Sequence, residues 1–344
     1  MRILVTGATG FVGSHTALAL RAAGHQVRLL VRTPAKLGRV MALHGLSLNE
    51  RSFDDIVTGD VTDAETVKQA LEDCDGVVHT AAFVSTHKKD ADKVISTNVG
   101  GTRNVIGQGC ELGLRHLIHI SSVAALYDPN LPVLTGDEPP TDSDSAYGHS
   151  KAACEHYVRE LQEQGYPVSI VYPASIIGPH DPGLSEPMNA LRIFAARMGV
   201  VTSRGNQFID VRDIADACVA IIEKLDGPER IPLGGHYYPW KSLIDTLYEL
   251  TGRRVPYAPI PGPLLRMMGK LGDYVIGLTG VDIPFTSEGM QYATRWVCTD
   301  DSKFENLLGL NFRDHRETLV DSLRSLYTAG HIQRKHLGKL ITDD

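Results

Sequence analysis

The segment Thr6-Gly7-Ala8-Thr9-Gly10-Phe11-Val12-Gly13 follows a short apolar run and precedes a stretch rich in alanine and leucine. Its glycines, spaced Gly-x-x-Gly-x-x-Gly, lie where a predicted strand meets a predicted helix. Gly7 permits a tight turn, Gly10 lets backbone amides approach a pyrophosphate, and Gly13 lets the helix pack close to the strand. The helix N-terminus adds partial positive charge. The segment therefore predicts a dinucleotide-binding loop. Its expected contact residues are Gly7, Thr9, Gly10, Phe11, Val12 and Gly13.

Short apolar, β-branched runs alternate with longer helical patterns through the first half of the chain. The predicted strands are 3–5, 26–31, 53–58, 76–79, 117–120 and 168–172. The predicted helices between them are 11–23, 64–71, 94–112 and 146–164. Strands and helices that alternate in this way form right-handed βαβ crossovers. The sequence therefore predicts an α/β fold, a doubly wound parallel Rossmann sheet with a smaller, mostly helical C-terminal lobe that binds substrate.

The alternation ends after Pro173, where a proline-rich stretch begins. One more strand is predicted at 231–238. The further predicted helices are 188–196, 213–225, 241–250, 263–280 and 317–327. We expect a dinucleotide-binding domain over 1–177, with 206–250 returning to it. We expect a substrate lobe built from 178–205 and 251–330, followed by a flexible tail at 331–344.

The composition excludes several classes of protein. The 344 residues include 34 lysines and arginines against 41 aspartates and glutamates, and the formal net charge is −7. This charge gives no broad electrostatic reason to bind nucleic acid or an anionic membrane. The five cysteines form no Cys-x-x-Cys pair and the fourteen histidines have no metal-binding spacing, so we expect neither disulfides nor a metal. With no signal-peptide pattern and no apolar span, since 263–280 is too polar, we expect a cytoplasmic protein.

Basic residues follow the second predicted strand, where a dinucleotide fold places the adenosine ribose. Arg32 cannot accept a hydrogen bond from a 2′-hydroxyl, but it matches a 2′-phosphate bidentately. Lys36 and Arg39 follow it, so three cations lie beside the predicted phosphate. They favour NADP(H) over NAD(H), and the alternative is a solvated basic loop.

Two other segments follow predicted strands of the same sheet. Asp60, with Val61, is placed either to hold the adenine amino group or to cap the next helix. The small residues Thr80, Ala81 and Ala82 follow the fourth strand. Their size lets a cofactor pass close over the strand ends.

A serine, a tyrosine and a lysine form the candidate catalytic set. Ser121 and Ser122 end the fifth strand, and Tyr147 and Lys151 follow, four residues apart on a predicted helix. That spacing places both side chains on one face. A phenol is a poor acid–base catalyst at neutral pH, and a neighbouring cation stabilises its phenolate. Tyr147 is thus expected to exchange a proton with a substrate oxygen that Ser122 also binds, while Lys151 also grips the nicotinamide ribose.

The chain resembles the extended short-chain dehydrogenase/reductase family, the NAD-dependent epimerase/dehydratase group, over about residues 1–250. Besides the glycine loop, Ser121-Ser122 and the Tyr147…Lys151 pair, the resemblance includes Asp60, Asn98 and 208–213. The strand end 27–32 looks most like dihydroflavonol-4-reductases and related 3β-hydroxysteroid dehydrogenases. The reductase branch uses NADPH and reads its 2′-phosphate with basic residues at the positions of Arg32 and near Arg39.

The family resemblance implies roles for matching residues. Ser122, Tyr147 and Lys151 would be the catalytic three, and Asn98 would support a proton relay or a helix bend. Three residues would line the nicotinamide: Pro173, Ala174 and Ser175. The helices 94–112 and 146–164 are where this family usually pairs into a homodimer. Many sugar epimerases of the group carry a third hydroxyl after the serine pair, but this chain has Val123.

Three functions follow, in order of preference. The first is an NADP(H)-dependent oxidoreductase for the carbonyl or secondary alcohol of a moderately apolar small molecule. The second is a nucleotide-sugar epimerase or dehydratase with tightly held NAD, which would need a diphosphate clamp. The candidates for that clamp are Arg192, Arg197 and Arg204. The third is a dinucleotide-sensing protein without turnover.

Three other side chains look less functional. His149 is expected to point away from Tyr147, and Cys154 to be a packed thiol. Met267 and Met268 are expected to be core, or else to roof an apolar substrate pocket.

Overall fold

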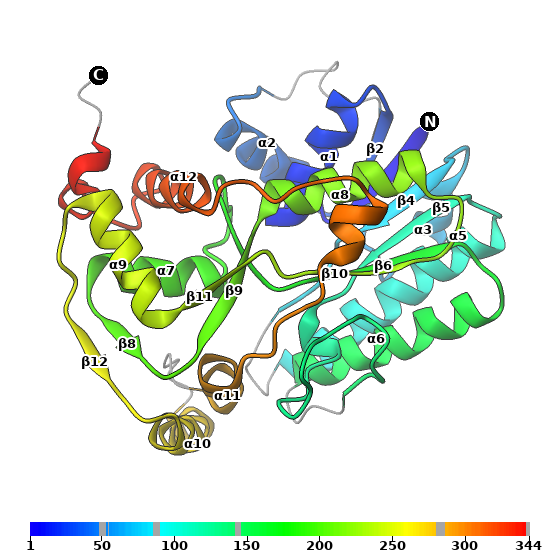
Figure 1. Ribbon diagram of the computed structural model, residues 1–344. Coiled ribbons are helices and arrows are strands. Elements are labelled where there is room, and N and C mark those ends of the chain that lie inside the picture. Colours follow the sequence, from blue (N-terminus) through cyan, green and yellow to red (C-terminus); the bar gives the residue numbers. More distant parts are fainter. Residues whose placement is uncertain (48–52, 54, 85–89, 142–145, 280–285, 342–344) are drawn as a thin grey trace.

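The computed structural model describes residues 1–47, 53, 55–84, 90–141, 146–279 and 286–341 (Figure 1). Its largest element is a parallel sheet of seven strands in the order β10-β6-β5-β4-β1-β2-β3. These strands are β1 (Arg2–Thr6), β2 (Gln26–Val31), β3 (Asp55–Thr58), β4 (Gly76–His79), β5 (His116–Ile120), β6 (Val168–Pro173) and β10 (Arg230–Leu233). The predicted doubly wound sheet is confirmed. The strand order reverses between β1 and β4, which is where open α/β sheets bind ligands at their carboxyl edge.

Helices cover both faces of this sheet, and alternate residues of each strand pack against different helices. Ile3 and Val5 of β1 belong to a core with α1 (Phe11–Ala22), α2 (Pro34–Leu43) and α8 (Val211–Lys224). Leu4, between them, packs instead with α3 (Ala64–Leu71) and α6 (Ala146–Glu163) on the opposite face. α8 lies directly against α1, and both helices cover the same face of the large sheet.

The helix predicted at 94–112 is wound unevenly. It begins as α4 (Ala91–Ile95), continues through π-helical turns at Ser96–Gly100 and Arg103–Gly107, and ends as α5 (Gln108–Glu111). Such turns admit an extra residue and are frequent at functional sites. The first of them carries Asn98.

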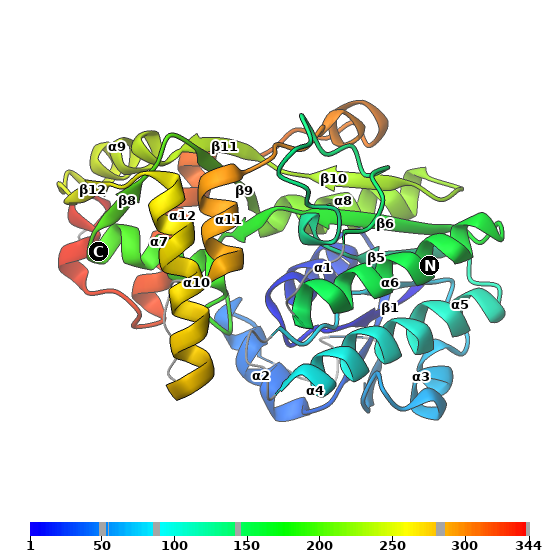
Figure 2. The ribbon, with the colours of Figure 1, turned by 90° about the horizontal axis from the view of Figure 1, so that it is seen from below.

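The second lobe lies beside the carboxyl edge of the large sheet (Figures 1 and 2). Its strands are β7 (Ser175–Ile177), β8 (Gly199–Val201), β9 (Gly205–Asp210), β11 (His236–Pro239) and β12 (Tyr257–Pro259). Its helices are α7 (Glu186–Ala196), α9 (Trp240–Thr251), α10 (Gly262–Thr279), α11 (Ser287–Arg295) and α12 (His315–Thr328). A third core joins α7, α9 and α12 with β7, β9 and β11, and it includes Leu191, Trp240 and Leu323. None of the helices among the described residues is long and apolar enough to cross a membrane.

The single strand predicted at 231–238 is wrong. The chain instead forms β10 in the large sheet and then β11 in a three-stranded sheet with β9 and β7. Gly235 makes the break because its φ is +72° and a Cβ there would lie 2.3 Å from the Phe208 carbonyl oxygen. Apolar periodicity continues across this break, so the sequence pattern does not reveal it.

The C-terminal residues differ from the expected flexible tail. Ile332 and Leu337 join the core of the second lobe, and His336 is also buried. Short 3₁₀ turns form at Arg334–His336 and Gly338–Leu340. The basic sequence suggested a solvated end, but the apolar residues of this segment pack into the core of the second lobe, where Leu340 and Ile341 join Ile332 and Leu337. Residues 342–344 lie outside the described part of the chain.

Three histidines join the two lobes. They are His15 of α1, His44 after α2 and His180 after β7. The ring of His44 lies 4.7 Å, centroid to centroid, from each of the other two rings, and the rings of His15 and His180 are 6.2 Å apart. His15 Nε2 lies 3.0 Å from the Pro179 carbonyl oxygen, and the His180 amide donates to Ser325 of α12 at 2.8 Å. No group among the described residues has the geometry of a metal site. We define these three residues as the histidine cluster.

Protonation of the histidine cluster opposes folding. Burial, together with the charges of the neighbouring rings, lowers the pKa of His15 to about 4 and that of His44 to about 3. An unfolded histidine titrates near 6.5, so the unfolded chain binds more protons between about pH 4 and 6.5. Stability from the cluster is therefore complete above pH 6.5 and declines as the pH falls through this window.

We predict that His15→Gln flattens the pH dependence of stability between about pH 6.5 and 4. The slope of the unfolding free energy against pH should differ from that of the wild type by the equivalent of one proton. Over the whole window this difference amounts to about 3 kcal/mol, at about 1.36 kcal/mol per pKa unit. Denaturant titrations at several pH values measure it. The slope must be compared with that of the wild type because other groups also titrate in this window. Burial raises the pKa of Asp213 and Asp301 to about 6, and these two carboxyl groups make the folded state more stable, not less, as the pH falls. The exposed His156→Gln control should keep the wild-type slope; equal slopes for all three proteins would contradict the prediction.

Candidate active site

The glycine loop forms a turn that leaves the first amides of α1 uncapped. Gly7 has φ +79°, and its carbonyl accepts a hydrogen bond from the Gly10 amide at 2.8 Å. Gly10 occupies the N-cap position, and no side chain accepts from the first turn of the helix. Unpaired amides at a helix N-terminus attract an anion. The loop thus has the chemistry that a pyrophosphate requires.

Close contact between this loop and the end of β4 explains the third glycine. A Cβ at Gly13 would lie 2.3 Å from the Gly7 carbonyl oxygen and 2.5 Å from Thr80 Oγ1. A Cβ at Gly7 would lie 2.7 Å from the Ala81 amide nitrogen. Thr80 Oγ1 donates to the Thr6 carbonyl at 2.7 Å and fixes this approach. The residues present therefore form a cradle that side chains would fill, which fits a dinucleotide.

The expected adenosine end brings Arg32 and Asp60 together. Arg32 is 57% exposed, and one of its guanidinium nitrogens lies 3.6 Å from Asp60 Oδ2. The other carboxylate oxygen accepts from the Thr62 amide and hydroxyl, both at 3.0 Å. The alternative role of Asp60 as a helix cap is wrong, because Asp63 caps α3 by accepting from the amides of residues 65 and 66. Lys36 and Arg39 lie exposed on α2.

Ser122, Tyr147 and Lys151 lie together at the carboxyl edge. Ser122 follows β5, and its hydroxyl is a hydrogen-bonding neighbour of the Tyr147 phenol. Lys151 Nζ lies 5.8 Å from the centre of the Tyr147 ring and donates to the Ile120 carbonyl at 3.3 Å. Both side chains project from one face of α6, as their spacing predicts.

Asn98 connects the segment after β4 to the start of α6. Its side-chain oxygen accepts from the Phe83 amide at 2.7 Å, and its nitrogen donates to the Phe83 carbonyl at 3.1 Å. The same nitrogen donates to Ser150 Oγ at 2.9 Å, and that hydroxyl donates to the Tyr147 carbonyl at 2.7 Å. The side chain of Asn98 thus connects the π-helical turn, through Ser150, to the first turn of the helix on which Tyr147 and Lys151 lie.

A buried network around Glu155 holds the rest of α6 in place. Glu155 accepts from Ser121 at 3.0 Å, from Tyr172 at 2.6 Å and from Arg159 at 2.6 Å. A fully buried carboxylate is tolerated only when it is paired and hydrogen-bonded in this way. Burial lowers the pKa of Lys151, and the charge of Glu155 counteracts that shift. The network therefore favours the protonated lysine.

Two carboxylates from the second lobe face Tyr147, and our sequence reasoning missed both. Glu186 lies in the first turn of α7 and Glu288 in the first turn of α11. Burial raises the pKa of Tyr147, the charges of Glu288 and Glu186 raise it further, and the Ser122 hydrogen bond lowers it. No spacing rule links residues 147, 186 and 288, and helix α11 itself was not predicted.

Aromatic rings lie beside Glu288. Tyr292 donates to Glu288 at 3.2 Å, and its ring packs edge-on against Tyr127 with centroids 4.7 Å apart. Trp296 packs against Tyr292 from the other side, with centroids 6.1 Å apart. A group of aromatic rings thus adjoins Glu288, one of the two carboxylates whose charge acts on Tyr147.

The other predicted residues take less prominent positions. Pro173 ends β6 and Ser175 begins β7, where the Ser175 hydroxyl accepts from Asn206 at 2.8 Å. His149 is exposed and Cys154 is buried against Thr102, as expected. Arg192 donates to Asn189 of its own helix.

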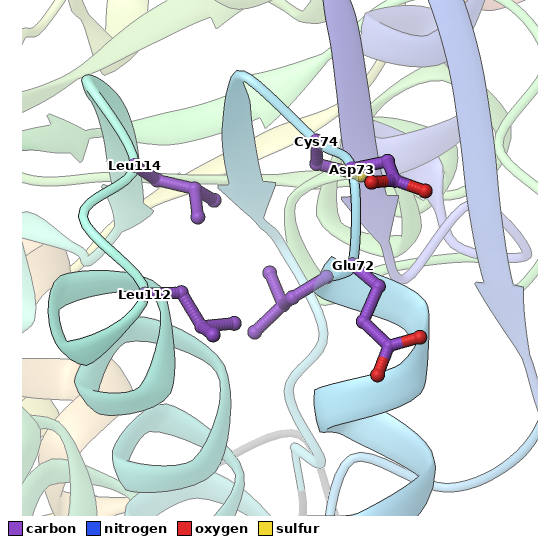
Figure 3. Close-up of a pocket in the computed structure, with 6 residues that line it drawn as sticks. Glu72, Asp73, Cys74, Leu112 and Leu114 are labelled. Carbon is purple, nitrogen blue, oxygen red and sulfur yellow. The ribbon is translucent and has the colours of Figure 1, made fainter.

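A hollow at the opposite edge of the sheet offers no comparable chemistry. Figure 3 shows Leu112 and Leu114 on one side and Glu72, Asp73 and Cys74 on the other. These residues precede β4 and β5, so they lie at the amino ends of the strands. Because ligands of such sheets bind at the carboxyl ends, we place the candidate site there and not in this hollow.

Comparison with known proteins gives the same family along most of the chain. A family model described as "NAD dependent epimerase/dehydratase family" matches residues 3–234. The chain is 33% identical over 280 residues to "Sterol demethylase protein B" of Methylococcus capsulatus, covering 79% of this chain and 81% of that protein. It is 27% identical over 337 residues to "Putative dihydroflavonol 4-reductase" of Synechocystis sp., covering 96% and 95%.

A solved structure has a similar fold. UDP-glucuronic acid 4-epimerase from Bacillus cereus, in complex with UDP-glucuronic acid and NAD, superposes with a TM-score of 0.71 and 22% identity. The match covers 96% of this chain and all of that one.

We predict that Gly13→Ala weakens dinucleotide binding strongly and destabilises the fold by about 1–3 kcal/mol, because the new Cβ meets backbone and a fixed hydroxyl. Denaturant unfolding and fluorescence titration with NADPH and NADH measure the two effects. Gly100→Ala is the matched control, because a Cβ there meets nothing within 4 Å. It should be neutral or stabilising, as alanine usually is in a helix. Similar losses in both variants would count against a close approach at Gly13.

Proposed function

The chain belongs to the NAD dependent epimerase/dehydratase family, and from that premise we propose that it is an NADP(H)-dependent oxidoreductase. Its substrate is the carbonyl or secondary alcohol of a moderately apolar small molecule. The main support for the proposal is that Ser122, Tyr147 and Lys151 lie close together at the carboxyl edge of the large sheet, the edge at which the glycine loop also lies.

The residues of the glycine loop hold the cofactor in this proposal. The uncapped amides of α1 bind its pyrophosphate, and Arg32, with Lys36 and Arg39, binds the 2′-phosphate. Arg32 is exposed and its one ion pair is long, so it can turn toward a phosphate at little cost. When bound, the reduced nicotinamide supplies the hydride that reduces a carbonyl carbon.

Tyr147 gives the proton to the substrate oxygen as the carbonyl becomes an alcohol. Burial and the charges of Glu288 and Glu186 raise its pKa, so the phenol is protonated at neutral pH and carries the proton that it would transfer. Ser122 donates a second hydrogen bond to the same oxygen, and the charge of Lys151 stabilises the phenolate that remains. In the oxidation direction the single proton passes from the alcohol oxygen to Tyr147.

The walls around Tyr147 support an uncharged substrate. Tyr127, Tyr292 and Trp296 supply aromatic surface, and Glu186 and Glu288 repel an anion. The names of two relatives refer to sterols and to dihydroflavonols, which supports a moderately apolar substrate. An epimerase would need cations for a nucleotide diphosphate, and Arg192 is already bound to Asn189.

We predict that Tyr147→Phe lowers turnover of NADPH with carbonyl substrates at least a hundredfold, because general acid catalysis contributes about 10²–10⁴-fold. Absorbance at the nicotinamide band measures it over aromatic, steroid-like and aliphatic ketones and aldehydes. Cofactor affinity should stay within a few-fold of wild type. NAD that copurifies, does not exchange and is not consumed would overturn the reductase and favour an epimerase.

We predict that Arg32→Ala raises the KM for NADPH at least tenfold and changes the KM for NADH little, because only NADPH presents a 2′-phosphate. Steady-state kinetics with both cofactors provide the ratio. The exposed Lys68→Ala on α3 is the control and should leave both KM values unchanged. If Arg32→Ala affects both cofactors equally, the assignment of NADP(H) is wrong.

A further inference from the structure

Helix α10 turns a row of apolar side chains toward solvent. Leu264, Met267, Leu271 and Tyr274 are 43%, 62%, 63% and 65% exposed. Their spacing of three, four and three residues places them on one face of the helix. We call this row the α10 stripe. It overturns our expectation for Met267, which is neither core nor the roof of a pocket.

The opposite face of α10 packs on α11. Leu265 and Gly269 are buried there, and a Cβ at Gly269 would lie 2.8 Å from the Thr286 carbonyl oxygen. Figure 1 shows α11 between α10 and the rest of the molecule. The stripe therefore lies on the outer side of the outermost helix of this lobe.

Two of the three charged residues of α10 are bonded to α11 or to the segment that begins it. Arg266 donates to Thr294 on α11, at 2.9 Å, and Asp273 accepts from the Ser287 amide, at 3.2 Å. Lys270 is exposed beside the stripe. An exposed lysine flanking leucine, methionine and tyrosine is the pattern of a helix that lies in a lipid interface, where the lysine reaches the phosphates and tyrosine is favoured.

A second copy of the chain fits this face less well. Stable interfaces use about 20–30 residues on each side, whereas the stripe offers four large apolar side chains. The stripe is also too short for a coiled coil between two copies of α10, because the apolar seam of a coiled coil continues over about three heptads or more.

We infer that α10 docks the protein on the surface of a phospholipid bilayer with an anionic component, with the α10 stripe inserted among the headgroups. Apolar burial supplies most of the binding, and Lys270 adds attraction to anionic headgroups. The overall charge of −7 does not oppose this, since beyond about 10 Å charges are largely screened at ordinary salt. The inference depends on the exposed face alone and not on the proposed reaction.

Vesicle co-sedimentation of the full chain, without substrate or cofactor, tests the inference. The probes are vesicles of phosphatidylcholine alone and of phosphatidylcholine with phosphatidylglycerol. We expect the wild type to bind both, and the double variant Met267→Asp/Leu271→Asp to bind at least tenfold more weakly. Leu112→Asp, at a residue 44% exposed after α5, is the matched control and should bind like the wild type. Circular dichroism and Tm check that all variants fold.

A milder variant keeps the test decisive if the double variant does not fold. Lys270→Gln should bind anionic vesicles roughly fivefold more weakly, since one basic residue near such a surface contributes about 1 kcal/mol. Its binding to phosphatidylcholine alone should not change. Absence of wild-type binding overturns the inference, as does equal binding of the wild type and the double variant. A dimer in analytical ultracentrifugation that the double variant dissociates, with no vesicle binding, would assign the stripe to a second copy instead. Loss of reductase activity in Tyr147→Phe tests the proposed function separately.

Discussion

The close approach of α1 to the end of β4 is the constraint on which the site depends. It requires a residue without a Cβ at Gly13, because the space that a Cβ would occupy is filled by the Gly7 carbonyl and the Thr80 hydroxyl. The approach leaves the first amides of α1 uncapped at the carboxyl edge of the sheet. Ser122 and α6 reach the same edge from β5 and the crossover after it, so in the proposed reaction the cofactor and the proton donor meet there.

The electrostatics around Tyr147 combine opposing effects from two lobes. The dinucleotide-binding unit supplies Ser122 and Lys151, and the buried Glu155 favours the charge of that lysine. The second lobe supplies Glu186 and Glu288, which raise the pKa of the phenol together with burial. Because the carboxylates come from α7 and α11, any shift of the second lobe changes the acidity of a group on the first.

Buried polar contacts hold the two lobes in register. The histidine cluster connects α1 and α2 to the segment that enters the second lobe. Asp210 caps α8, pairs with Arg212 and accepts from Thr318 of α12 at 2.8 Å. Such groups are costly to bury unless all their partners are present, so they specify one relative arrangement of the lobes.

The sequence by itself determined the parallel sheet, the glycine loop and the pairing of Tyr147 with Lys151, because each depends on residues close together in the chain. Strand and helix periods are local, and so is an i, i+4 pair on one helix. Only the tertiary structure divided 231–238 between two sheets, brought Glu186 and Glu288 to Tyr147, and gathered His15, His44 and His180. It also decided that the apolar row on α10 faces solvent. Those features depend on which distant segments pack together, and a hydrophobic period does not state which neighbour, or whether any, will cover a given face.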